Sequence, residues 1–284
     1  MTTRPALNVL SLLTSARWAI TRDALERMMA IAEREPGELL ARLRAEAEDG
    51  DDALPRFERR ALLSVPAAAH PASERIGVRD GVAILSVTGP LCRYASFFQE
   101  ICGMTSYQQL AEDFRIAIDD VGIRAIVLHL DSPGGETNGC AELAALVHAH
   151  RGHKPIVAMV SDAAASAAYW IAAACDEIVV SPSAYVGSIG VYWEIEDWSA
   201  AEAAAGLKRW RIVSSQSPNK VPDPADAAGK AILQMEVDQW ADAFVAAAAQ
   251  YRGVTPDELV AAGNGGALYI GRFAVERGLA DRVA

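Results

Sequence analysis

Runs of apolar residues alternate with amphipathic segments over most of the chain. The runs at 82–87, 125–130 and 155–160 have the length and continuous apolar character of β-strands, and the second is typical of a strand buried on both faces of a parallel sheet. The segment 105–120 is amphipathic, and 136–150 also has a helical pattern. This alternation predicts an α/β fold with right-handed βαβ crossovers and helix-covered sheets. The remaining elements are predicted as a helix at 165–174, strands at 177–180 and 209–213, a helix at 226–250 and a short helix within 270–284.

The N-terminal part of the chain has a different pattern. Thr21 can cap a helix whose apolar residues recur at helical spacing, and Pro36 opens a second such helix. The acidic segment 46–52 then has the composition of a solvated linker. We therefore expect residues 1–75 to form a small helical arm with a linker, and residues 76–284 to form the main α/β domain.

Composition narrows the possible partners. The chain has 284 residues, of which 51% are hydrophobic, so it can form the hydrophobic core of a globular domain. With a net charge of −11, the chain lacks the excess of positive charge by which proteins bind nucleic acid or an anionic membrane surface. No window of about eighteen apolar residues occurs and no secretory pattern begins the chain, so we expect a cytoplasmic protein without a membrane span. The four cysteines are spaced neither as a redox pair nor as a zinc site.

Three segments contain candidate chemistry. The turn at 131–135 ends a buried strand with two adjacent glycines, whose N–H groups could receive developing negative charge. Ser166 begins a predicted apolar helix, with its own amide and that of Ala167 close to its hydroxyl. Lys220 lies in a proline-rich loop between a predicted strand and the long helix. Taken singly, each has an ordinary interpretation: a strand-to-helix turn, a helix cap and a solvated charge.

A serine nucleophile needs a base, and no histidine has the context of a catalytic triad. The histidines lie in the linker, in a buried strand or around the end of one helix: His70, His129, His148, His150 and His153. A lysine can replace histidine if its amine is neutral, which requires a desolvated pocket and no nearby carboxylate. Asp223 would therefore have to point away from Lys220. Lys208 lies beside arginines and Lys230 lies on the long helix, so neither is the better candidate.

Four segments, in this order, carry a family resemblance: Asp131-Ser-Pro-Gly-Gly135, Lys154-Pro-Ile-Val-Ala158, Ala165-Ser-Ala-Ala-Tyr-Trp170 and Gly187-Ser-Ile-Gly-Val191. Together they resemble the signal peptide peptidase A family of serine peptidases, and in particular its phage and prophage branch, which serves in capsid assembly. The resemblance covers about residues 80–284. It implies a Clp/crotonase-like superhelix of ββα units.

The resemblance also assigns catalytic roles. It implies that Ser166 is the nucleophile and Lys220 the general base of a Ser-Lys dyad. Ser188 is similar to a second family serine that orients the lysine amine by a hydrogen bond. These roles imply peptide hydrolysis through an acyl-enzyme, without a metal or a cofactor.

The oxyanion hole is similar to a pair of backbone amides, those of Gly135 and Ala167. Gly134 and Gly187 would shape the substrate-binding site. Family members usually carry two glycines after the nucleophile, whereas this chain has Ala167 and Ala168. The added methyl groups put the size of the substrate in doubt.

The implied partners are peptides or proteins, namely capsid, scaffold or portal-associated proteins, inside a phage procapsid or virion or in the cytoplasm. The resemblance also implies a homo-oligomer in which a neighbouring subunit can supply the lysine. Two alternatives stay open: a crotonase-like acyl-CoA enzyme, which would use the same two amides without a serine nucleophile, and a capsid-assembly protein that keeps the fold but cleaves nothing.

Overall fold

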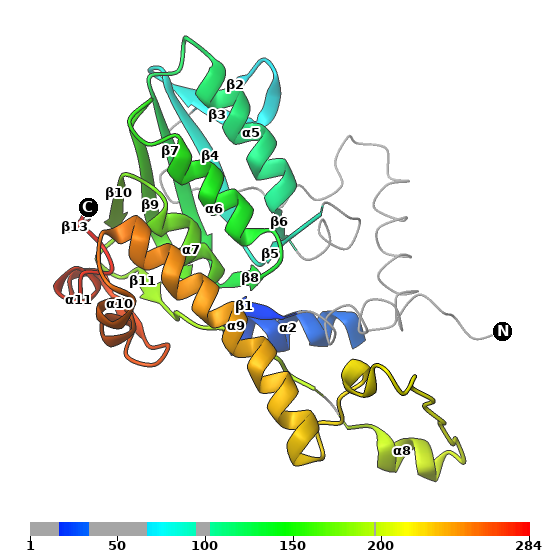
Figure 1. The fold of residues 1–284 in the computed structure, drawn as a ribbon. Helices are drawn as coiled ribbons and strands as arrows, with labels where there is room; N and C mark the ends of the chain where they lie inside the picture. The colour runs from blue at the N-terminus through cyan, green and yellow to red at the C-terminus, as the bar shows by residue number, and fades with distance from the viewer. Residues whose placement is uncertain (1–16, 34–66, 95–102, 196) are drawn as a thin grey trace, which may run out of the picture.

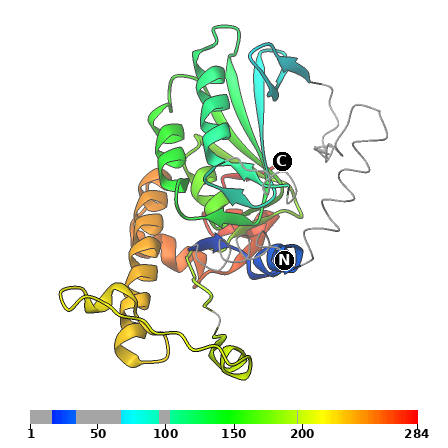
Figure 2. The same cartoon turned by 90° about the vertical axis from the view of Figure 1, so that its right-hand side faces the viewer.

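The structure is a computed structural model that describes residues 17–33, 67–94, 103–195 and 197–284. Over these residues the fold is α/β, as predicted, with a large mixed sheet flanked by helices (Figures 1 and 2). Along its main path the sheet has the order β12-β11-β9-β7-β4-β3-β2. These strands are β2 (Ala68–His70), β3 (Ser73–Arg79), β4 (Val82–Thr88), β7 (Ala125–Ser132), β9 (Ile156–Ala165), β11 (Tyr185–Gly187) and β12 (Leu268–Ile270).

The centre of this sheet is parallel, and it divides at β9. Strands β4, β7 and β9 run parallel. The first half of β9 pairs with β10 (Glu177–Val180), which in turn pairs with β13 (Arg282–Val283). The last three residues of β9, 163–165, pair instead with β11. The division leaves Ser166, the residue after β9, at the edge where strand ends converge, which is where α/β folds place their sites.

A second, four-stranded sheet lies beside these strand ends, in the order β1-β8-β5-β6. Its strands are β1 (Trp18–Ile20), β5 (Leu91–Cys92), β6 (Thr105–Ser106) and β8 (Gly134–Glu136). Strand β1 comes from the predicted N-terminal arm, and it pairs antiparallel with β8. The predicted N-terminal arm and the double-glycine turn are therefore neighbours in space.

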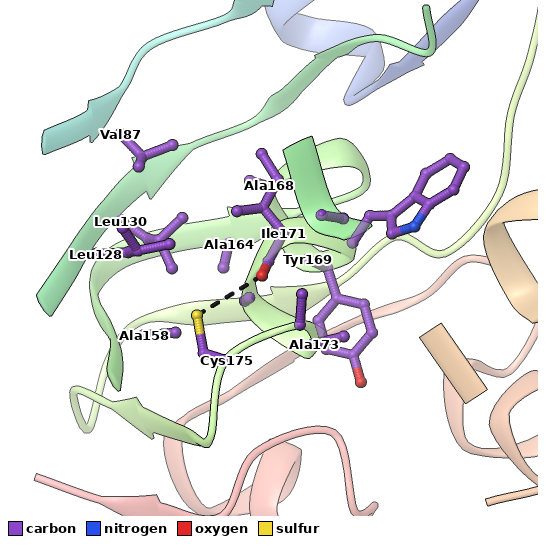
Figure 3. Packing of buried hydrophobic residues seen from close by; sticks show 14 of the residues in the cluster. Val87, Leu128, Leu130, Ala158, Ala164, Ala168, Tyr169, Ile171, Ala173 and Cys175 are labelled. Carbon is purple, nitrogen blue, oxygen red and sulfur yellow. Dashed lines mark hydrogen bonds between the residues drawn. The ribbon is translucent and has the colours of Figure 1, made fainter. Parts of the chain in front are cut away.

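The described residues also form helices, one of which lies entirely inside the protein. They are α2 (Arg22–Glu33), α5 (Tyr107–Asp119), α6 (Cys140–Ala149), α7 (Ala167–Ala173), α8 (Ser199–Ala204), α9 (Ala227–Arg252), α10 (Pro256–Gly263) and α11 (Gly271–Glu276). Every residue of α7 is buried, which its alanines permit because small side chains let neighbouring backbones approach closely (Figure 3). Trp170 of α7 stacks on Phe244 of α9 with ring centroids 4.7 Å apart.

The structure corrects one predicted element. The segment 209–213 was expected to be a strand, but it has no strand partner within the described residues. Two of its three apolar side chains are almost fully exposed, Trp210 at 85% and Ile212 at 97%. Figures 1 and 2 show α8 and the chain that follows it beside the N-terminal end of α9, away from the main sheet. An apolar, strand-like sequence therefore lacks a sheet edge to join within one chain.

The predicted arm is only partly described. A helix does begin after Thr21, at Arg22, and the structure adds β1 just before it. The predicted helix after Pro36 and the acidic linker 46–52 lie outside the described residues. Residues 68–75, placed in the linker by the prediction, form β2 and the start of β3, and the division of the chain at residue 75 stays a prediction. No helix in the described ranges is both long enough and apolar enough to cross a membrane.

Candidate active site

Ser166 occupies a sharp turn between strand β9 and helix α7. Its backbone has φ 54° and ψ −116°, a conformation that residues with a side chain rarely adopt. The turn is fixed on both sides, because Ser166 N donates to Gly187 O at 2.8 Å and Ser166 O accepts from Trp170 N at 3.0 Å. Non-glycine residues are held in such conformations at a cost of about 1–3 kcal/mol, and they gather at functional sites. The strain indicates that this serine is held in place for a purpose other than capping a helix.

The hydroxyl of Ser166 points toward the chain that follows β11. Its Oγ donates to Gly190 O at 3.3 Å, and the residue is only 1% exposed. Gly187 must be glycine here, because it has φ 128° and a Cβ would lie 2.4 Å from Ala267 O. The next residue, Ser188, also has positive φ, and its amide donates to Ala267 O. The structure thus places Gly187 and Ser188 beside the Ser166 turn, as the sequence predicts.

The double-glycine turn reaches the same place from β7. A Cβ on Gly134 would lie 3.0 Å from Ala165 O, and one on Gly135 would lie 2.0 Å from Leu91 O. Both positions therefore require glycine for close approach of the backbone. The turn brings Gly134 directly against the end of β9, one residue before Ser166.

Two residues that the sequence analysis did not single out shape this turn. Ser132 is fully buried, and its Oγ donates to Gly89 O at 2.7 Å while accepting from Gly134 N at 3.2 Å. The hydroxyl of Tyr107 donates to Glu136 O at 2.7 Å and so anchors the far end of β8. Burial raises the pKa of Tyr107 well above its usual range, which keeps this donor protonated. Ser132 stands in the quoted motif, but only tertiary structure brings Tyr107 to it.

Ala167 and Ala168 lie in the buried core rather than on an open groove wall. The methyl groups that distinguish them from the family pattern are therefore packed against the protein. As the first residue of α7, Ala167 has an amide with no acceptor inside the helix. The carbonyl of Ala167 accepts from Cys140 Sγ at 3.4 Å, and burial raises the pKa of that thiol, so Cys140 is a packed side chain and not a nucleophile.

Lys220 does not join the other candidates within one chain. It ends a short 3-10 turn, Pro218–Lys220, in the exposed segment between α8 and α9. It lines an open hollow together with residues that include Arg17, Trp193 and Glu236. Among the described residues, the hydrogen bonds of Ser166 go to residues 170, 187 and 190, and none reaches this segment.

No described histidine contacts Ser166. His129 lies inside β7, where burial lowers its pKa, and its Nε2 has no hydrogen-bond partner among the described residues. His70 pairs with Asp120 at 2.8 Å, far along the sheet at β2. Within the described part of the chain, no three His, Cys, Asp or Glu side chains gather as metal ligands would.

Comparison with known proteins identifies the family. Residues 148–284, which include the Ser166 turn, match the family model described as Peptidase family S49. The chain is also 31% identical over 210 residues to the head-tail preconnector protein GP5 of Enterobacteria phage P21. The matched residues, 148–284, belong to peptidase family S49. This is the family resemblance that the four sequence segments predict, and it is confirmed.

Other relatives of this S49 chain are named as proteases. It is 28% identical over 212 residues to capsid assembly protease C of Escherichia phage lambda, and 30% identical over 193 residues to Protease 4 of Salmonella typhi. The three alignments cover 72%, 72% and 64% of this chain. They cover only 41%, 47% and 30% of the relatives, so the S49 chain spans less than half of each relative's length.

Proposed function

We propose that this chain is a serine endopeptidase that hydrolyses peptide bonds through Ser166 and Lys220. The observation that carries the proposal is the strained, buried turn at Ser166, which lies against both the double-glycine turn and the Gly187-Ser188 segment. A crotonase-like acyl-CoA enzyme would not need a strained serine at this position. Membership of a peptidase family supports the same reaction.

The proposed reaction uses Ser166, Lys220, Ser188 and two backbone amides. The neutral amine of Lys220 takes the hydroxyl proton while Ser166 Oγ bonds to the peptide carbonyl carbon. The amides of Gly135 and Ala167 stabilise the resulting oxyanion, each contributing about 2.7–4 kcal/mol to transition-state binding. The amine leaving group takes the proton from Lys220, and water then hydrolyses the acyl-enzyme by the same route in reverse. Ser188 would orient the lysine amine.

We infer that Lys220 acts on the Ser166 of a neighbouring copy. Within one chain, the segment that carries Lys220 lies away from Ser166. The same segment exposes large apolar side chains, as interaction surfaces do. They are Trp198, Leu207, Trp210, Ile212 and Val221. Docking of this segment on a second copy would bury them, and it would remove Lys220 from water, which favours its neutral form. The protein would then be a homo-oligomer whose sites are completed across interfaces.

The names of two relatives indicate the biological setting. One is a capsid assembly protease and the other a head-tail preconnector protein. We propose that this chain likewise cleaves a capsid, scaffold or portal-associated protein during capsid maturation, within a phage procapsid. A non-catalytic assembly role is the alternative that the experiment below addresses.

The test is covalent labelling of Ser166 by a fluorophosphonate, located by mass spectrometry in the assembled protein. The proposal predicts labelling of Ser166 that disappears in Ser166→Ala and falls at least about 100-fold in Lys220→Ala. Lys230→Ala, on the exposed start of α9, is the matched control and should label normally. An unlabelled wild-type protein would favour the non-catalytic alternative, and normal labelling of Lys220→Ala would eliminate the dyad.

A further inference from the structure

Strand β1 lies between β8 and the chain that follows Ser188. On one side its residues face β8, with Trp18 opposite Glu136, Ala19 opposite Gly135 and Ile20 opposite Gly134. On the other side, Trp18 N donates to Tyr192 O at 3.1 Å and Tyr192 N donates back to Trp18 O at 3.0 Å. Figure 1 shows this short strand next to β8. Three residues of the N-terminal arm thus fill the space between the double-glycine turn and the chain that follows Ser188.

The register of this pairing engages the Gly135 amide. Thr21 N donates to Pro133 O, and Thr137 N donates to Arg17 O. Hydrogen-bonded pairs alternate along an antiparallel ladder, so the pair midway between these two, Ala19 and Gly135, exchanges hydrogen bonds. The amide that the proposed mechanism assigns to the oxyanion therefore already donates to the carbonyl of Ala19.

Ala19 also lies close to the nucleophile. A Cβ on Gly134 would meet both Ala19 O, at 2.1 Å, and Ala165 O, at 3.0 Å, so these two carbonyls are neighbours. Ser166 follows Ala165 directly, and its Oγ bonds Gly190 O, two residues before the Tyr192 that holds Trp18. An extended chain pairs with strand edges in this way when it binds as a substrate, with alternate side chains in pockets.

The alternation of side chains fits such a bound peptide. Ala19 packs with the main core, on the side of α7, and is fully buried. The side chains of β1 on the other face pack into a separate cluster with α2, together with one residue of β5 and the residue just before β6. That cluster comprises Trp18, Ile20, Ala24, Leu25, Met28, Cys92 and Met104. The apolar face of α2 therefore holds β1 in the groove.

We propose that β1 is an internal inhibitor, a strand that occupies the peptide groove with the Ala19 carbonyl in the position of the cleaved bond's carbonyl. The inference rests on the proposed function for the roles of Ser166 and Gly135. A substrate must displace residues 17–20 before its own carbonyl can reach the Gly135 amide. The resting chain is closed, and weakening the hold of α2 opens it.

The test opens the groove by substitutions in the arm of the full chain. Met28→Asp places a charge in the buried cluster, and Arg27→Asp makes the same residue at the adjacent, exposed position as its control. Thr21→Pro is a second variant that puts no charge into the cluster, since it removes the amide that donates to Pro133 O. None of these residues belongs to the proposed catalytic machinery.

The first measurement does not depend on catalysis. In a Ser166→Ala background, a fluorescent peptide with the sequence of residues 15–23 is titrated against each variant. We expect at least about tenfold tighter binding to the opened variants than to the parent or to Arg27→Asp, because a site that is seldom free has a reduced apparent affinity. Equal binding to all four proteins, or no binding to either opened variant, would overturn the proposal.

The second measurement uses the intact serine. Fluorophosphonate labelling of Ser166 should be at least about tenfold faster in Met28→Asp and Thr21→Pro than in Arg27→Asp. Opened variants that bind the peptide but are labelled no faster than a reactive parent would contradict an inhibitory role. Cleavage of the resting wild-type chain after Ala19 would also contradict it, since a strand that clears itself does not inhibit. Peptide binding without labelling of any variant would count against the proposed catalysis, and not against the position of β1.

Discussion

The strain at Ser166 predicts an unusual effect of glycine. Ser166→Ala and Ser166→Gly remove the same hydroxyl, so their difference isolates the β-carbon at φ 54°. Relief of the strained backbone favours glycine by about 1–3 kcal/mol, with this glycine-preferring conformation at the upper end. Two effects favour alanine instead: burial of one methyl group contributes about 0.8 kcal/mol, and the larger entropy of glycine in the unfolded chain contributes about 0.4–1 kcal/mol.

The balance is about 1 kcal/mol in favour of Ser166→Gly, or about 2–4 °C in Tm. Ser161, in the middle of β9, is the matched control because its φ is negative and its environment is half-buried. At that ordinary strand position alanine should be the more stable by about 0.5–1 kcal/mol. The assay is thermal unfolding of all four variants by calorimetry. If Ser166→Ala is at least as stable as Ser166→Gly, the serine turn stores no strain and the reasoning from its geometry is wrong.

Three further predictions concern the parts around the serine. Gly135→Ala would place a Cβ 2.0 Å from Leu91 O, so fluorophosphonate labelling of Ser166 should fall at least about 100-fold. Retained labelling would show that the reaction of Ser166 does not need the close backbone approach at Gly135. Tyr107→Phe removes the hydroxyl bond to Glu136 O and should destabilise the protein by about 1 kcal/mol in denaturant unfolding, whereas Tyr94→Phe, on the exposed surface, should change nothing. Burial alone would raise the pKa of Asp281, but hydrogen bonds from Arg252 and the Ile178 amide outweigh burial and lower that pKa. The ionised carboxylate therefore stabilises the fold above its unfolded-state pKa, and this stabilisation is lost as the pH falls through the folded-state pKa. Asp281→Asn should therefore flatten the acid limb of the stability–pH curve, and an unchanged limb would contradict the assignment.

Local pattern was enough to predict the main sheet and its helices. Strands β4, β7 and β10 and helix α9 lie close to their expected positions, because long apolar runs and a long helical pattern are strong local signals. Strand β9 runs to Ala165, five residues beyond its predicted end. Its last residues are mostly alanines, which favour a helix by propensity, and only pairing with β11 keeps them extended.

Non-local pairing explains what the sequence did not predict. Strand β1 has three residues, and it is a strand because β8 and Tyr192 provide hydrogen-bonding partners that are more than a hundred residues away. The opposite error occurred at 209–213, where a strand-like sequence has no strand partner among the described residues. The motifs pointed to Ser166, Gly135 and Ser188, which the structure brings close together, whereas Lys220 lies in the exposed segment between α8 and α9.

The central claim is that Ser166 and Lys220 meet across two copies of the chain. It is tested most directly by mixing Ser166→Ala and Lys220→Ala proteins, dissociating and reassembling them, and measuring fluorophosphonate labelling of the intact serine. Each variant alone should be inactive, and a random equal mixture should recover about a quarter of the wild-type sites, because one parent supplies the serine and the other the lysine. If the two variants form mixed oligomers and recover no labelling, the lysine does not act from a neighbouring copy.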